Sequence, residues 1–169
     1  MQAHEYIQRQ VQSMRRLTDA ALQGLTDEQV NWVPPGQANP VRAALLHLVA
    51  AEDRYFQTIL RGQPMLWEAG GWSERIGLPY PPSAGRGWDE VKTTPVTLAS
   101  VQAYAQAVRA ATESYLAALT DEELDRTVQF FGGDRPAADV IATFVAHTVG
   151  HAGEIAALRG VQGVKGLPF

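Results

Sequence analysis

The 169-residue sequence contains no cysteine. This excludes disulfides, thiolate nucleophiles and sulfur ligands, so a metal site in this protein must be built from histidine, carboxylate and water. An excess of basic residues is also absent, because 14 lysines and arginines stand against 18 aspartates and glutamates. The resulting net charge of −4, with no basic stripe, offers nucleic acid no electrostatic partner.

Long hydrophobic runs are absent as well. No apolar stretch approaches the roughly 20 residues that cross a bilayer, and the N-terminus is polar rather than signal-like. We therefore expect a cytoplasmic protein without a membrane partner. The 46% hydrophobic composition is enough for a sizeable core, which predicts a single domain over residues 1–169.

Helical periodicity is present in four stretches of the chain, where apolar residues recur every three to four positions. The pattern predicts helices near residues 3–24, 40–61, 97–119 and 136–159. Pro136 suits the first turn of the last helix and Gly160 suits its end, with the tail (161–169) folded back as coil. We predict an all-α four-helix bundle with a long crossover between the second and third helices, because strands have little to form from.

Two short segments are repeated in the chain. Residues 25–28, Leu-Thr-Asp-Glu, reappear at 119–122, and residues 60–62, Leu-Arg-Gly, reappear at 158–160. These internal repeats predict two halves of the chain, each built as helix, loop, helix.

The crossover, residues 62–96, holds much of the proline and glycine together with Trp67, Trp72, Tyr80 and Trp88. A connection of this length is uncommon in a compact domain. Its aromatic residues predict an ordered segment that covers one end of the bundle.

The last predicted helix carries the strongest chemical signal. One of its faces combines apolar and metal-binding residue types: Val140, Phe144, His147, His151, Glu154 and Leu158. His147 and His151 lie one turn apart, about 6 Å between α-carbons by helix geometry, and so can converge on one metal ion.

His47 lies at the edge of the apolar stripe of the second predicted helix, among alanines that leave room for an ion or ligand. Taken alone, such a histidine is more often a hydrogen-bonded core residue. The histidine pair on the last helix makes metal binding by His47 the preferred interpretation. His4, near the N-terminus, is expected to be a loose terminal residue. Three neutral imidazoles would leave a divalent ion with positions open to water or substrate.

Two familiar metal motifs are missing. Thr148 and Val149 stand where a zincin protease has its glutamate, and the Glu-x-x-His repeats of di-iron bundles are absent. The carboxylates nearest to the histidines in sequence are Glu154 and Glu52, and either is a candidate to orient a ligand or accept a proton. For Glu52 we expect a solvent-exposed position.

Two segments resemble a known family: residues 45–56, Leu-Leu-His-Leu-Val-Ala-Ala-Glu-Asp-Arg-Tyr-Phe, and residues 147–160, which begin His-Thr-Val-Gly-His-Ala-Gly-Glu. They are similar to the DinB/YfiT-like superfamily of metal-binding four-helix bundles, which is distinct from the DNA polymerase that shares the DinB name. The similarity covers nearly the whole chain. It implies that His47, His147 and His151 bind one divalent metal, zinc or nickel first and iron or manganese second.

The resemblance also implies a chemistry. Characterised relatives include thiol-dependent enzymes, such as mycothiol-dependent maleylpyruvate isomerase and bacillithiol S-transferases, so the expected partners are a low-molecular-weight thiol and an electrophile. A metal-dependent hydrolase and a non-catalytic metal-binding stress or scaffold protein are the alternatives. A substrate cleft lined by Trp67, Trp72 or Trp88 would favour an enzyme. A metal fully enclosed by protein would favour the non-catalytic scaffold protein. Relatives that commonly pair, and helix faces rich in alanine and leucine, predict a homodimer.

Overall fold

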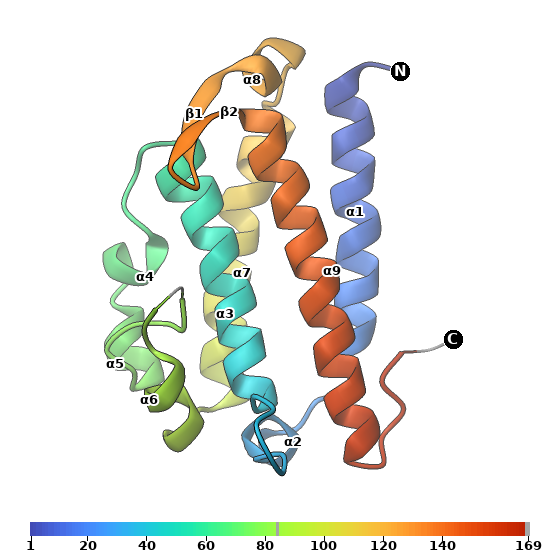
Figure 1. Cartoon of the computed structure of the whole chain (residues 1–169), viewed down its shortest axis with the longest axis vertical. Coiled ribbons are helices and arrows are strands. Elements are labelled where there is room, and N and C mark those ends of the chain that lie inside the picture. Colours follow the sequence, from blue (N-terminus) through green and yellow to red (C-terminus); the bar gives the residue numbers. More distant parts are fainter. Residues whose placement is uncertain (84, 168–169) are drawn as a thin grey trace.

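The computed structural model describes residues 1–83 and 85–167, and four long helices lie side by side in it (Figure 1). They are α1 (Ala3–Leu22), α3 (Val41–Asp53) with its π-helical continuation η1 (Arg54–Leu60), α7 (Leu98–Ala117) and α9 (Ala137–Val161). α9 packs against α1 and α3, and α3 also packs against α7. The predicted all-α bundle is therefore confirmed, with helix ends close to those expected. Within the described residues, no helix has both the length and the apolar character needed to cross a membrane.

The described residues of the crossover, 62–83 and 85–96, lie along the flank of the bundle rather than over its end as predicted (Figure 1). Its short helices α4 (Leu66–Ala69), α5 (Trp72–Ile76) and α6 (Trp88–Thr93) pack on α3 and α7. The reason is that Trp67 and Trp72 are buried, with ring centroids 5.3 and 5.4 Å from that of Tyr104 on α7. These two tryptophans serve the core.

A buried carboxylate at the end of α3 fixes the start of the crossover. Asp53 is fully buried and accepts hydrogen bonds from the backbone N–H groups of Leu66 and Trp67, both at 2.9 Å, and from the Tyr104 hydroxyl at 2.7 Å. Burial raises the pKa of Asp53, and these hydrogen bonds oppose that shift. The carboxylate thus joins α3, α4 and α7.

A buried guanidinium at the start of α3 fixes the end of the crossover. Arg42 donates from Nε to the carbonyl of Val91 at 2.6 Å and from Nη1 to the carbonyl of Asn31 at 2.6 Å, and it also donates to the carbonyl of Lys92. Val91 and Lys92 belong to α6. The Arg42 guanidinium therefore holds α6 against the start of α3.

A β-hairpin precedes α9, so the expectation that strands had little to form from was wrong. β1 (Thr127–Phe130) and β2 (Gly133–Pro136) pair antiparallel, with Phe130 opposite Gly133. Val128 and Phe130 are buried and alternate with exposed neighbours, the period of a half-buried strand. Phe131 and Gly132 form the two-residue turn with φ of 49° and 77°, the left-handed backbone that such turns require. Pro136 ends β2 and precedes α9, outside the helical turn predicted for it.

The repeated Leu-Thr-Asp-Glu segments fold alike. Thr26 accepts a hydrogen bond from the backbone N–H of Gln29 and begins α2 (Asp27–Asn31), and Thr120 accepts one from Glu123 and begins α8 (Asp121–Asp125). Each is a capping residue of a short helix that connects two long ones. The repeat of Leu-Thr-Asp-Glu is thus a repeat of local structure.

The end of α9 differs from its predicted position. Gly160 lies inside the helix, and Gly163, with φ of 78°, adopts the left-handed conformation that ends it. The tail then folds back as expected, because Gly166 lies so close to the backbone of Ala156 that a Cβ atom there would clash. Pro168 and Phe169, the last residues of the predicted coil, lie outside the described residues.

Removing the Asp53 carboxylate tests this arrangement. Asp53→Ala leaves two buried N–H groups and one buried hydroxyl without an acceptor, so we expect the free energy of unfolding to fall by about 3 kcal/mol or more. Urea denaturation measures this change. Asp125→Ala, at an exposed carboxylate of α8, is the control and should change the stability by about 0.5 kcal/mol or less. Equal effects of the two substitutions would contradict an anchoring role for Asp53.

Candidate metal centre

Three imidazoles from two helices meet where α3 packs against α9. His47 belongs to α3, and His147 and His151 belong to α9, one turn apart. A ring nitrogen from each lies within 4.8 Å of one from each of the other two. Nε2 of His47 is 3.0 Å from Nε2 of His147, and the ring centroids of His47 and His151 are 4.9 Å apart. The structure therefore brings together the three histidines that the sequence singles out.

Two of the three imidazoles are oriented through the ring nitrogen that points away from the cluster. Nδ1 of His47 lies 2.9 Å from the carbonyl oxygen of Pro82, and Nδ1 of His151 lies 2.6 Å from Oε2 of Glu154. A carbonyl or a carboxylate can only accept, so Nδ1 carries the proton in both rings. In the neutral rings, Nε2 is then left with a free lone pair. Partners of this kind commonly orient histidines that bind metals.

His147 is held neutral by its surroundings. Burial, followed by the nearby charges of His151 and His47, lowers its pKa to about 4. Burial also lowers the pKa of His47. A divalent ion needs unprotonated rings, so the cluster is ready to bind near neutral pH.

Nδ1 of His147 is buried and has no hydrogen-bond partner among the described residues. Nε2 is the nitrogen of His147 that lies against His47, so an ion bound through Nε2 would still leave Nδ1 without a partner. The donor set offers three neutral nitrogens at short mutual distance and no sulfur. It fits a single divalent ion of the type that imidazole prefers.

The two candidate carboxylates have different surroundings. Glu154 is half-buried beside the cluster, and its pKa is lowered mainly by the hydrogen bond from His151. Glu52 is 2% exposed, so the expected solvent-exposed position was wrong. Both of its oxygens pair with the guanidinium of Arg15 on α1, which compensates the buried charge. Glu154 therefore belongs to the site, and Glu52 to the packing of α1 on α3.

His4 was also expected to be loose, and this was wrong. Its backbone N–H donates to Oδ1 of Asp121 at 2.9 Å, and its Nδ1 lies 2.7 Å from the same oxygen. The two contacts join α1 to α8. His4 is thus a partly buried residue with a structural partner, separate from the three-histidine cluster.

Aromatic rings flank the cluster on two sides. The ring centroid of Trp88 lies 4.9 Å from that of His47, and Trp88 Nε1 donates to the carbonyl of Ser83 at 2.9 Å. Tyr55, which the sequence analysis did not select, lies with its ring centroid 6.2 Å from that of His147. Its spacing of four residues from Ala51, and eight from His47, was the signal that it shares their helix face.

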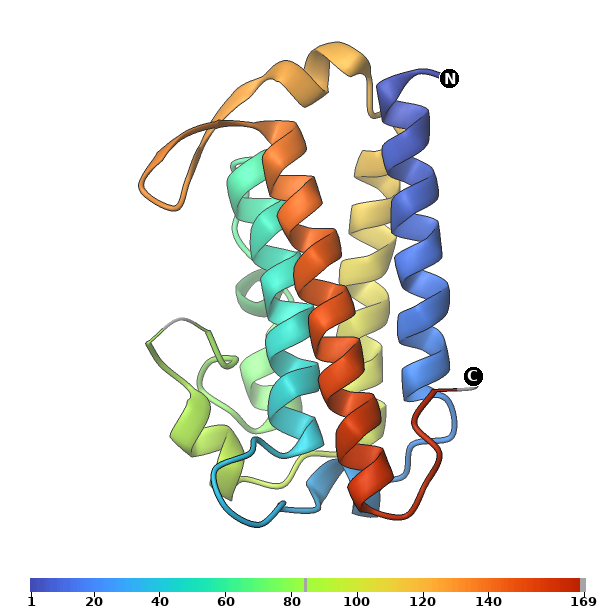
Figure 2. The ribbon, with the colours of Figure 1, turned by 45° about the vertical axis from the view of Figure 1, so that its right-hand side comes forward.

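The cluster is open to solvent on one side. All three histidines are only partly buried, and the His151 side chain is 22% exposed. Figure 2 shows the β1–β2 hairpin and the segment before α6 projecting from the same side of the bundle. Of the three tryptophans considered as cleft-lining residues, Trp88 alone lies against the cluster, since Trp67 and Trp72 pack on Tyr104. The site is an accessible centre rather than an occluded one.

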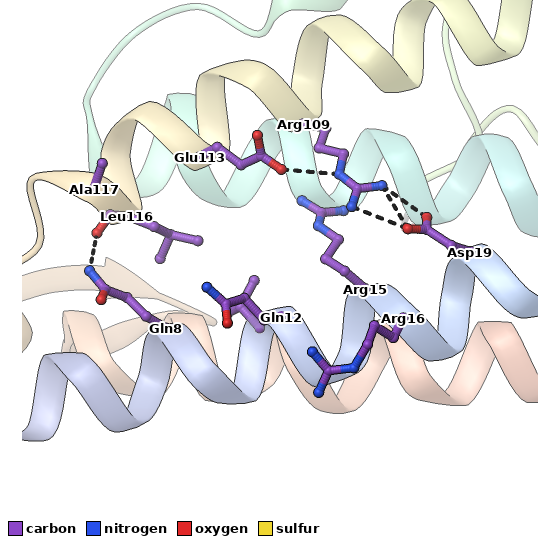
Figure 3. A pocket seen from close by; sticks show the side chains of 10 residues that line it. Gln8, Gln12, Arg15, Arg16, Asp19, Arg109, Glu113, Leu116 and Ala117 are labelled. Carbon is purple, nitrogen blue, oxygen red and sulfur yellow. Dashed lines mark hydrogen bonds and ion pairs between the residues drawn. The ribbon is translucent and has the colours of Figure 1, made fainter. Parts of the chain in front are cut away.

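Two cavities of about 620 and 770 Å³ lie elsewhere, between α1 and α7. Figure 3 shows the first, which is spanned by the ion pair of Arg109 with Asp19 and by the hydrogen bond from Gln8 to the carbonyl of Leu116. None of the three histidines is among the described residues that line either cavity. The charged groups Arg109, Asp19 and Glu113 pair with one another there, and we place the chemistry at the histidine cluster.

Comparison with known proteins identifies the family and agrees with the fold. The family model described as the DinB superfamily matches residues 10–155. No curated protein matches the chain significantly. A crystal structure titled as the conserved protein of a locus from Enterococcus faecalis superposes with a TM-score of 0.78, covering 96% of this chain and 99% of that one, at 19% sequence identity. At that identity the likeness shows the fold alone.

The lowered pKa of His147 predicts a pH dependence of stability in the metal-free protein. Unfolded His147 binds a proton below about pH 6.5, whereas folded His147 stays neutral down to about 4. The unfolded state therefore binds more protons between these values, and the free energy of unfolding should fall as the pH is lowered through this window. Urea denaturation of chelator-treated protein at pH 7 and pH 4.5 measures the loss. His147→Gln should lose less stability than the wild type, and equal losses would contradict the lowered pKa.

Proposed function

Because the chain belongs to the DinB superfamily, we propose that it is a metalloprotein that binds one divalent ion through His47, His147 and His151. The observation that carries this proposal is the convergence of the three ring nitrogens within 4.8 Å. The Pro82 carbonyl and the Glu154 carboxylate, which accept from Nδ1 of His47 and His151, support this proposal. They leave the free lone pair of each ring on Nε2, which faces the cluster. The family resemblance makes zinc or nickel the first candidate for this ion, and iron or manganese the second.

We further propose that the site uses a low-molecular-weight thiol, as a thiol-dependent S-transferase or isomerase. An ion held there would lower the pKa of a bound thiol and so supply a thiolate near neutral pH. In a transfer reaction the sulfur forms a bond to an electrophilic carbon, the displaced group leaves with the electron pair, and the thiol proton passes to solvent. The chain has no cysteine, so the sulfur must come from a small molecule. The partial exposure of the histidines supports its access.

The surroundings of Glu154 favour thiol chemistry over hydrolysis. Hydrolysis commonly uses a carboxylate that is free to accept a proton from water. Glu154 is the carboxylate that contacts the cluster among the described residues, and it already accepts a hydrogen bond from His151. A thiol has an ordinary pKa of about 8.5, far below that of water, and so depends less on such a base. The same exposure of the three rings favours an enzyme over a scaffold protein with an enclosed ion.

Metal content of histidine variants tests the site. We expect His47→Ala, His147→Ala and His151→Ala each to abolish stoichiometric binding at neutral pH, because two imidazoles hold an ion far more weakly than three. His4→Ala is the matched control and should keep full metal content, since His4 contacts Asp121 instead. Elemental analysis measures the metal, and a thiol-transfer assay against common electrophiles measures activity on the same samples. Full stoichiometry in His47→Ala would show that the three-histidine site is wrong, and fully loaded protein without transfer would contradict the thiol chemistry.

Homodimer formation and a cytoplasmic location stay predictions of the sequence. For the dimer we propose that two bundles associate side by side through helix faces, as closed two-fold pairs commonly do. Sedimentation equilibrium at micromolar concentration measures the mass. We expect twice the mass of the chain, and a species of single-chain mass alone would contradict the dimer.

A further inference from the structure

Tyr55 combines a buried ring with a hydroxyl that makes no hydrogen bond to the described residues. The side chain is 8% exposed. The hydroxyls of Tyr80, Tyr104 and Tyr115 each donate to a carboxylate, and Tyr6 is 51% exposed to water. Buried tyrosines usually find a partner for the hydroxyl, so Tyr55 departs from the pattern of this chain.

The Tyr55 hydroxyl remains within reach of solvent. It is not among the enclosed polar atoms that lack a partner, although it makes no hydrogen bond, so part of its surface is accessible. A tyrosine hydroxyl has an ordinary pKa of about 10 and is protonated at neutral pH. It is therefore available as a donor.

The Tyr55 ring lies beside the metal centre. Its ring packs edge-on against those of His147 and Phe130, with centroids 6.2 and 5.6 Å apart. His47, Ala51 and Tyr55 follow one another at steps of four, which places them on one face of α3 and the start of η1. Helical side chains lean toward the N-terminus of their helix, which is the direction of His47.

We propose that the Tyr55 hydroxyl donates a hydrogen bond to an anionic ligand at the open side of the three-histidine centre, and so holds a thiolate or a similar anion in place. This inference rests on the proposed metal site. Trp88 flanks the cluster at His47, and Tyr55 with Phe130 flanks it at His147. The ligand class that this arrangement fits is an anion with an apolar body, which the two aromatic walls can contact.

Anion binding to cobalt-loaded protein tests the role of Tyr55 without any assay of activity. Cobalt(II) in place of the native ion gives a visible spectrum that changes when azide binds. Tyr55→Phe keeps the ring packing and removes only the donor. A hydrogen bond to a charged acceptor is strong enough that we expect azide affinity to fall about 10-fold to 100-fold, with cobalt content unchanged.

Two controls make this result specific. Tyr115→Phe removes a hydroxyl that donates to Glu123, away from the cluster, and should bind azide as the wild type does. Added imidazole is the second control. Once one of its nitrogens binds the metal, the other carries a proton, so no lone pair is left to accept a hydrogen bond from Tyr55. The affinity for imidazole should therefore be the same with and without the Tyr55 hydroxyl. An equal loss of imidazole affinity would indicate a change of shape and overturn the proposal.

The failure of this inference can be told apart from the failure of the metal site. Intact cobalt content with unchanged azide affinity in Tyr55→Phe overturns the role of Tyr55 alone. Wild-type protein that takes up no cobalt overturns the three-histidine site, and the role of Tyr55 with it. Reduced azide affinity at full cobalt content, with imidazole unaffected, supports both.

Discussion

The buried carboxylate of Asp53 is the interaction on which the rest of the arrangement depends. It accepts hydrogen bonds from the first turn of the crossover and from Tyr104 on α7, so it fixes where the chain leaves α3. The same crossover then returns past α3 and carries Pro82 and Trp88 to His47. Without a fixed carbonyl at Pro82, nothing would select the tautomer of His47. A structural anchor near the end of α3 thereby sets the chemistry of a histidine near its middle.

The histidine cluster is a costly arrangement for a protein to keep. Three basic rings lie close together, and protonation of one disfavours protonation of the others. The short contact between two Nε2 atoms and the unpartnered Nδ1 of His147 add to the cost. Groups with strongly shifted pKa values that face solvent are more common at functional sites than in packing roles. The crowding of the Nε2 atoms is understandable if a bound ion takes up their lone pairs.

The sequence predicted what depends on local spacing. The four helices follow from apolar residues every three to four positions, and the pairing of His147 with His151 follows from one helical turn. Contacts between residues far apart in the chain were missed. Glu52 meets Arg15, 37 positions away, and His4 meets Asp121, 117 positions away, and no periodicity records such partners. The hairpin was missed because its strands span four residues each, too few for alternation to stand out.

The place of α9 in the bundle has a consequence for how the protein is made. α9 packs against α1 and α3 and carries two of the three histidines, while His47 and His147 are 100 positions apart. At roughly 5 to 20 residues per second, a ribosome needs about 5 to 20 s to travel that distance. During this time α1 and α3 have left the ribosome without the helix that covers their apolar faces. The nascent chain therefore exposes these faces until α9 is made, and an ion cannot contact all three histidines until translation has passed His151.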